Sequence, residues 1–167
     1  MTRVVVFGNS GSGKSTLALR LARELGIRHL DLDTVAWKPD QPGVREAFEK
    51  SRAALEAFFA ETENWIVEGC YASLLALAAE RATRLVFLNP GVPACQRNCG
   101  SRPWEPHKYA SKSAQDKNLA MLLDWVAGYD TRTDEFSLQA HRELFDAFAG
   151  PKFELAGNEE TRRFSLS

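Results

Sequence analysis

The residues best suited to chemistry lie near the start of the sequence, in the stretch GNSGSGKST from Gly8 to Thr16. It fits the spacing G-x-x-x-x-G-K-[ST], a pattern typical of loops that wrap phosphate groups. Glycine lets a backbone approach a phosphate closely, and successive N–H groups form a nest for anions. The pattern predicts a mobile charge from Lys14 and a Mg²⁺-ligating hydroxyl from Ser15. The predicted nucleotide contacts are Gly8, Asn9, Ser10, Gly11, Ser12, Gly13, Lys14, Ser15 and Thr16.

The flanking residues give the loop the setting that this pattern requires. Arg3 to Phe7 form a β-branched apolar run, which is typical of a buried strand. Thr16 to Leu25 have the leucine spacing of an amphipathic helix. Strand, loop and helix in this order predict a nucleoside triphosphate site. The alternative is a Gly/Ser-rich turn that binds nothing.

Acidic residues follow two further predicted strands. Ile27 to Asp33 is expected to end with Asp31 and Asp33, and Asn64 to Tyr71 carries Glu68. Ligands gather at the carboxyl ends of parallel strands, so these acids are expected near the phosphates. We expect Asp31 and Asp33 to bind an acceptor or a Mg²⁺-bound water. We expect Glu68 to hold a Mg²⁺-bound water or a nucleophile. The alternatives are a turn cap and a carboxylate at a helix start.

The segment from Thr34 to Gly43 contains two prolines and is expected to be a loop. Trp37 within it, together with Tyr71 after the next strand, is a candidate for lining an acceptor pocket. A surface tryptophan that packs on its own loop is the alternative for Trp37.

Length and composition limit the class of protein to which the chain can belong. The chain has 167 residues, of which 44% are hydrophobic and 26% charged, as in a single ordered globular domain. No apolar run reaches the roughly 18 residues of a membrane span. The first strand begins at once and leaves no room for a signal peptide, so a cytoplasmic location is expected. Oligomeric state is left open.

Positive charge is concentrated in one part of the chain. Between Arg81 and Lys117 there are seven Lys or Arg residues and two acids, although the whole chain has a net charge of −1. A nucleic-acid surface is one interpretation. We favour a lid at about residues 100–115 that clamps phosphate. Arg132, further along the chain, is a weaker candidate for a phosphate contact.

Three cysteines are an odd and low number, which fits a reducing compartment. Cys95, Cys99 and His107 are close in sequence, but a structural zinc site needs four ligands. Buried thiols are therefore favoured over zinc.

Strand and helix patterns alternate along the whole chain, which predicts an α/β fold with a parallel, doubly wound sheet. With the motifs in this order, the chain resembles small P-loop kinases of the adenylate kinase and shikimate kinase type. It is most similar to the DNA-topology-modulation-protein group, also described as adenylate kinase-like AAA-family ATPases. The shared blocks read HLDLDTVAWKP, WIVEGCY and LVFLNP.

This resemblance implies a three-layer P-loop fold with five parallel strands in the order 2-3-1-4-5 and ATP with Mg²⁺ at Gly8–Thr16. It puts Glu68 where relatives carry an Asp near the metal, and makes Arg97 and Arg102 the lid arginines. The expected activity is transfer of the ATP γ-phosphate to a small-molecule or nucleotide acceptor, with Lys14, Arg97, Arg102 and Asp33 as catalytic residues. The alternatives are a regulatory or nucleic-acid-linked ATPase and a nucleotide-binding module with vestigial hydrolysis.

Overall fold

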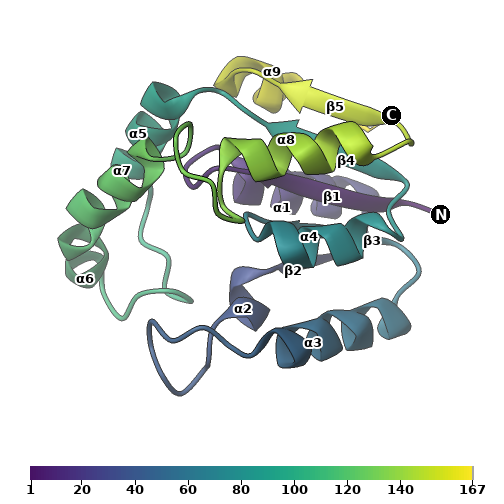
Figure 1. Cartoon of the computed structure of the whole chain (residues 1–167), viewed down its shortest axis with the longest axis horizontal. Helices are drawn as coiled ribbons and strands as arrows, with labels where there is room; N and C mark the ends of the chain where they lie inside the picture. The colour runs from purple at the N-terminus through teal and green to yellow at the C-terminus, as the bar shows by residue number, and fades with distance from the viewer. Residues whose placement is uncertain (167) are drawn as a thin grey trace.

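The computed structural model describes residues 1–166 and shows a five-stranded parallel sheet with helices on both faces (Figure 1). The strand order is β2-β3-β1-β4-β5, which confirms the predicted topology. The strands are β1 (Arg3–Gly8), β2 (Arg28–Asp31), β3 (Trp65–Gly69), β4 (Arg84–Leu88) and β5 (Lys152–Leu155).

The helices fill the connections between these strands and continue beyond the last one. They are α1 (Lys14–Leu25), α2 (Asp33–Ala36), α3 (Phe48–Glu61), α4 (Ala72–Ala79), α5 (Val92–Gly100), α6 (Lys112–Lys117), α7 (Leu119–Ala127), α8 (Leu138–Ala147) and α9 (Asn158–Arg163). None of them, within residues 1–166, is long and apolar enough to cross a membrane.

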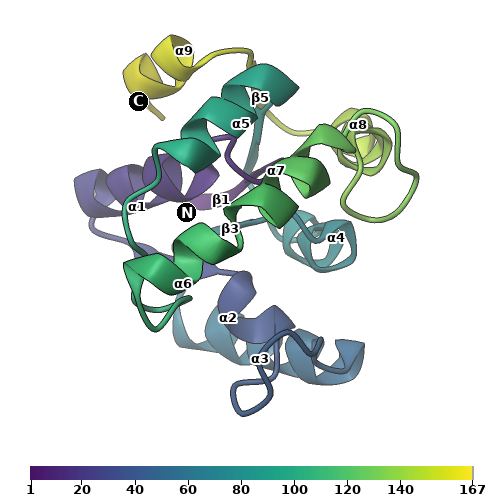
Figure 2. The same ribbon diagram turned by 90° about the vertical axis from the view of Figure 1, so that its left-hand side faces the viewer.

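Two hydrophobic cores arise because successive strand residues point to opposite faces of the sheet. On β1, Val5 and Phe7 pack towards α4 and α8, whereas Val4 and Val6 pack against α1. Continuous apolar runs in β1, β3 and β4 follow from this arrangement, since a parallel sheet is covered on both faces. A third, smaller cluster joins α5 to α7 around Cys95, Cys99 and Val126, and α6 lies beside it (Figure 2).

The structure corrects the predicted end of the second strand. β2 ends at Asp31, and α2 begins at Asp33, inside the region expected to be strand and loop. The carboxylate of Asp31 accepts a 2.8 Å hydrogen bond from the backbone N–H of Asp33. This local bond competes with the sheet ladder and turns the chain. Sequence patterns also missed α6 and α9, which are short and polar.

His141 of α8 fixes this helix to the chain just after β3. Its Nε2 lies 2.8 Å from the carbonyl oxygen of Cys70, which can only accept, so Nε2 carries the proton. Its Nδ1 then accepts from the hydroxyl of Tyr129 at 2.7 Å. Burial lowers the pKa of His141 to about 4, although the bond to Cys70 opposes this shift. The neutral ring is therefore the folded form.

This burial predicts a pH dependence of stability. Between pH 6.5 and about 4 the unfolded state binds a proton at His141 that the folded state does not. The free energy of unfolding therefore falls as the pH falls through this range, by up to about 3 kcal/mol. In a His141→Gln variant this loss should be absent, so its stability should approach that of the wild type as the pH falls. Urea denaturation of both proteins between pH 4.5 and 7.5 tests this, and a constant difference would contradict it.

Candidate active site

The loop Gly8–Thr16 connects β1 to α1 and turns back over the start of the helix. The backbone N–H of Ser12 donates to the carbonyl of Asn9 at 3.1 Å, and the Lys14 ammonium donates to the same carbonyl at 3.3 Å. The Asn9 side chain is anchored in turn to the carbonyl of Val126 at 3.2 Å. Gly13 precedes α1, and no side chain among the described residues caps this helix. Its first N–H groups are therefore available for an anion.

Gly11 must be glycine because of what lies beside it. Its φ is 76°, which side-chain-bearing residues rarely adopt. A Cβ there would also clash with the carbonyl oxygen of Cys95 and the sulfur of Cys99 on α5. The loop backbone thus rests directly on α5, and Asn98 of that helix donates to the carbonyl of Gly11 at 2.8 Å.

Ser15 and Glu68 form a buried oxygen pair beside this loop. The Ser15 hydroxyl donates to Oε1 of Glu68 at 2.7 Å, and Glu68 is only 1% exposed. Its second oxygen, Oε2, is buried without a hydrogen-bond partner, and His29 Nε2 lies 3.7 Å from Oε1. An orphaned carboxylate oxygen next to a hydroxyl fits a hard divalent cation. The described residues hold no group of three or more His, Cys, Asp or Glu that could bind a metal. A cation here would therefore need phosphate or water ligands as well.

Asp31 and Asp33 lie at the end of β2 and the start of α2 and have opposite electrostatic environments. Burial, reinforced by the charges of Glu68 and Asp33, raises the pKa of Asp31 to about 6. Burial also acts to raise the pKa of Asp33, but the ammonium of Lys108 and hydrogen bonds from Lys108 and Tyr71 outweigh it. The pKa of Asp33 is consequently lowered, and this carboxylate is ionised at neutral pH.

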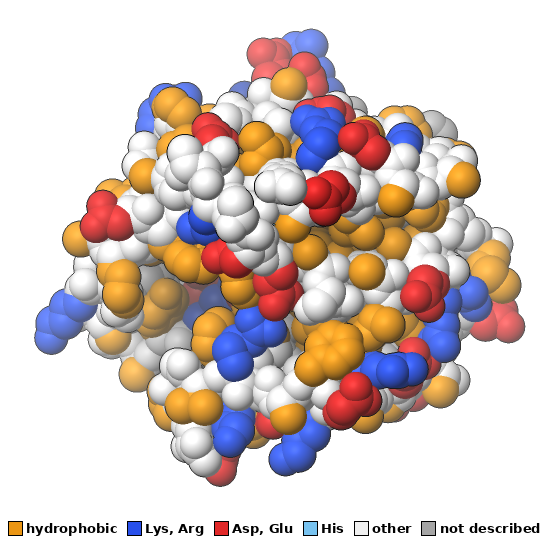
Figure 3. Space-filling view, viewed as in Figure 1, with side chains coloured by type: hydrophobic (Ala, Val, Ile, Leu, Met, Phe, Trp, Pro, Cys, Tyr) orange, Lys and Arg blue, Asp and Glu red, His pale blue; other side chains and the backbone are white. Residues whose placement is uncertain are grey.

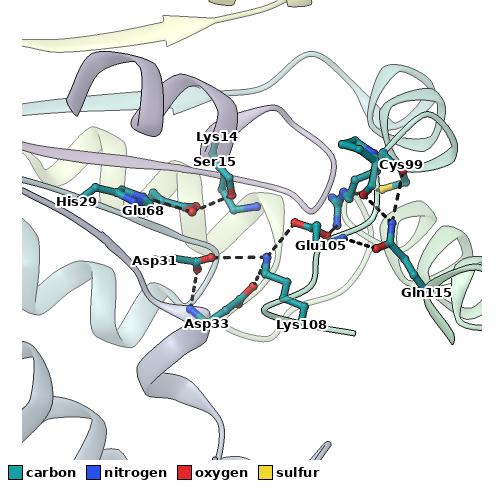
Figure 4. A network of polar contacts seen from close by, with 12 residues as sticks. Lys14, Ser15, His29, Asp31, Asp33, Glu68, Cys99, Glu105, Lys108 and Gln115 are labelled. Carbon is teal, nitrogen blue, oxygen red and sulfur yellow. Dashed lines mark hydrogen bonds and ion pairs between the residues drawn. The ribbon is translucent and has the colours of Figure 1, made fainter. Parts of the chain in front are cut away.

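Lys108 is a residue of this cavity that sequence patterns did not single out. Its ammonium lies 2.8 Å from Asp33, 3.6 Å from Asp31 and 3.5 Å from Glu105 (Figure 4). Burial acts to lower its pKa, but Asp33 and Asp31 raise it overall, so the charge is retained. The positive segment between Arg81 and Lys117 was the only indication, because it contains Lys108 without distinguishing it.

A cavity of about 860 Å³ brings most of these groups together. The space-filling view shows a hollow with acidic and basic side chains inside it (Figure 3). Its size is that of a typical small-molecule site. Predicted site residues in its wall are Ser10, Gly11, Gly13, Lys14, Ser15, Thr16, Asp31, Asp33, Glu68 and Arg102. The helix α9, which was not predicted, adds Asn158, Thr161 and Arg162.

Seven candidates lie outside the wall of this cavity: Gly8, Asn9 and Ser12 of the phosphate loop, and Arg97, Arg132, Tyr71 and Trp37. Arg97 is exposed on α5, and Arg132 stacks on the ring of Trp125 with its Cζ 3.7 Å from the ring centroid. Tyr71 is only 2% exposed, and Trp37 donates to its hydroxyl at 2.7 Å. Both aromatic residues therefore lie behind Asp33 and do not face the cavity. Arg102, by contrast, lines the cavity and donates to Glu105 at 3.3 Å.

The cysteines that suggested a zinc alternative have an apolar environment. Cys95 and Cys99 are buried together with Val126, against partly buried residues of α5 and α7. Burial raises the pKa of Cys95 to about 11, so its thiol is protonated at neutral pH. These two residues act as small apolar side chains in the cluster between α5 and α7.

Comparisons with known proteins agree with this geometry. The shikimate kinase family model matches residues 10–77, which is less than half of the chain. The structure resembles shikimate kinase from Bacteroides thetaiotaomicron, with 20% identity, 97% and 92% of the two chains covered and a TM-score of 0.55. It also resembles shikimate kinase from Aquifex aeolicus, with 18% identity, 97% and 90% of the two chains covered and a TM-score of 0.53. For TT1252 from Thermus thermophilus the identity is 14%, 96% and 91% of the two chains are covered, and the TM-score is 0.53. No curated protein matches the chain.

The partial family match, the loop Gly8–Thr16 and the fold are all similar to those of the P-loop small-kinase superfamily. The enzyme class that they define is an ATP-dependent kinase that phosphorylates a small molecule.

The raised pKa of Asp31 predicts that this residue costs stability at neutral pH. Because the folded state binds a proton that the unfolded state has lost, the free energy of unfolding falls as the pH rises from 3.8 to about 6. Asp31→Asn keeps an acceptor for the N–H of Asp33 and removes the charge. The variant should be more stable than the wild type at pH 8, by on the order of 1–3 kcal/mol, with a smaller difference at pH 5.

Urea denaturation at the two pH values measures this difference. Asp116→Asn is a suitable control, since Asp116 is exposed on α6 and pairs only with Lys112 among the ion pairs of the described residues. If Asp31→Asn proves less stable than the wild type at pH 8, the pair with Lys108 outweighs the cost of burial.

Proposed function

We propose that the protein transfers the γ-phosphate of ATP to a hydroxyl group of a small molecule bound beside Asp31 and Asp33. One observation carries this proposal: a single cavity has the phosphate-binding residues Lys14 and Ser15 in one part of its wall and the two aspartates in another. A module that only binds nucleotide needs the first part alone. The second part supplies a place for an acceptor.

At the phosphate end, the N–H groups of the loop and the Lys14 ammonium would hold and neutralise the phosphates. The Ser15 hydroxyl and the Glu68 carboxylate would hold Mg²⁺, which draws negative charge from the transferring group. Support for this assignment comes from the unpartnered Oε2 of Glu68. Here a Glu occupies the position expected for an Asp in related kinases.

At the acceptor end, the ionised Asp33 would accept a hydrogen bond from the acceptor hydroxyl and orient its oxygen for attack. Phosphoryl transfer depends mainly on such positioning and on charge stabilisation. Arg102 and Lys108 belong to the same segment above the cavity and would close over the substrates. Closure excludes water and so limits wasteful hydrolysis. Arg97 is exposed on α5 and does not line the cavity, so it takes no part in this closure.

The acceptor class can be found by a screen for ATP-to-ADP conversion above the acceptor-free rate. The panel should contain nucleosides, nucleoside monophosphates, sugars and hydroxy acids, with the phosphorylated product identified by mass spectrometry. Turnover with one class supports the proposal. ATP hydrolysis that no acceptor stimulates would instead favour the ATPase alternative, and tight ATP binding without turnover would favour the vestigial module.

Replacement of Lys14 should remove turnover without unfolding the protein. Lys14→Ala deletes the charge that faces the phosphates, and we expect ATP-dependent turnover to fall at least about 100-fold. Its fold should persist, because the only hydrogen bond that Lys14 makes among the described residues is the 3.3 Å bond to Asn9.

Lys112→Ala is the matched control. Lys112 is an exposed lysine of α6 that pairs with Asp116 and does not line the cavity. Turnover and circular dichroism should be unchanged in this control. Undiminished turnover in Lys14→Ala would remove the P-loop from the mechanism.

A further inference from the structure

Two stretches that the phosphate chemistry does not use meet behind the acceptor end of the cavity. Trp37, just after α2, donates from its indole Nε1 to the hydroxyl of Tyr71 at 2.7 Å. Tyr71, two residues after β3, donates from that hydroxyl to Oδ1 of Asp33 at 2.5 Å. The three side chains form one hydrogen-bonded chain that ends on the carboxylate assigned to the acceptor.

The direction of this chain is fixed by chemistry. An indole N–H can only donate, so the Tyr71 oxygen accepts from Trp37 and its single proton goes to Asp33. One oxygen of Asp33 is thereby occupied. The other, Oδ2, lies 2.8 Å from the Lys108 ammonium on the cavity side. Each carboxylate oxygen has two lone pairs, so Oδ2 can accept from the acceptor hydroxyl as well as from Lys108.

Burial of Tyr71 and contacts with Arg45 hold the two donors of this hydrogen-bonded chain, Trp37 and Tyr71, in place. Tyr71 is almost fully buried, and its burial together with the charge of Asp33 raises its pKa, so the hydroxyl remains protonated. The guanidinium of Arg45 lies over the Tyr71 ring at 4.6 Å and over the Trp37 ring at 5.4 Å. Arg45 also donates to the carbonyl of Ala36 at 3.2 Å, at the end of α2. Through these contacts Arg45 links the polypeptide segment that follows α2 to the segment that follows β3.

We propose that Tyr71 and Trp37 are positioning residues: their hydrogen-bonded chain fixes the side chain of Asp33 so that Oδ2 faces the acceptor. This inference rests on the proposed function, because it assigns the orientation of the group that receives the acceptor hydroxyl. Trp37 and Tyr71 thus act through Asp33, whereas direct contact with the acceptor was expected from the sequence.

Tyr71→Phe tests the proposal because it keeps the ring and removes only the hydroxyl. Loss of a donor should raise the pKa of Asp33, which can be followed by NMR titration of ¹³C-labelled aspartate carboxyls. Kinetics with MgATP and an acceptor identified in the screen should show kcat lowered about 10-fold or more, with KM for ATP within about twofold. The acid limb of the pH–rate profile should move to higher pH, because turnover requires ionised Asp33. Trp37→Phe should change the same quantities less, since Tyr71 keeps its proton.

Tyr129→Phe is the matched control. Tyr129 is also 2% exposed, and its hydroxyl makes a 2.7 Å hydrogen bond to His141, away from the cavity wall. Its removal should cost similar stability without moving the Asp33 titration or the acid limb.

The proposal is overturned if the Asp33 titration is unmoved in Tyr71→Phe, or if both tyrosine variants change kcat and the acid limb equally. The NMR titration needs no acceptor, so it decides the hydrogen-bonded chain even if the screen finds none. If the titration moves but the screen finds no acceptor, the hydrogen-bonded chain is supported and only the proposed function fails.

Discussion

The register of three parallel strands is the constraint on which the site depends. Val6 of β1 pairs with Glu68 of β3, and Glu68 pairs with Asp31 of β2. Glu68 therefore shares the face of Ile66, which packs towards α1, and there it meets Ser15. A shift of one residue would send its carboxylate to the opposite face, among the aromatic side chains of the other core. The hydrophobic pattern of β3 prevents this shift, so the core specifies the position of the charge.

Charge balance shapes the rest of the cavity. Asp31, Asp33 and Glu105 converge on the ammonium of Lys108. Glu105 and Lys108 both come from the polar, proline-containing segment that follows α5. Buried carboxylates without such a partner would shift strongly towards the neutral form. Asp31 shows part of this effect and Asp33 does not, because Lys108 lies closer to Asp33. Neighbouring acids thus acquire different properties from one lysine.

Much of this arrangement could be predicted from sequence, and the exceptions have physical reasons. The loop Gly8–Thr16 and the approach of Glu68 to that loop follow from local patterns and from the rule that strand ends converge. The strand order was implied by the resemblance to small P-loop kinases. Lys108 could not be distinguished from other lysines, because its two aspartate partners, Asp31 and Asp33, are about 75 residues away in the chain. Trp37 and Tyr71 were expected at the cavity. Tyr71 is buried and Trp37 is partly exposed, and the guanidinium of Arg45 lies over both rings, a contact that leaves no trace in hydrophobic periodicity.

The contact of Gly11 with Cys95 limits where the enzyme can bend. Since α5 lies against the phosphate loop with no room for a methyl group, a movement of α5 towards the loop is blocked. Any hinge of the lid then falls beyond Gly100, in the stretch that carries Arg102 and Lys108. Opening would swing these two cations away together, so a vacant acceptor space and an unshielded triphosphate would appear in the same movement.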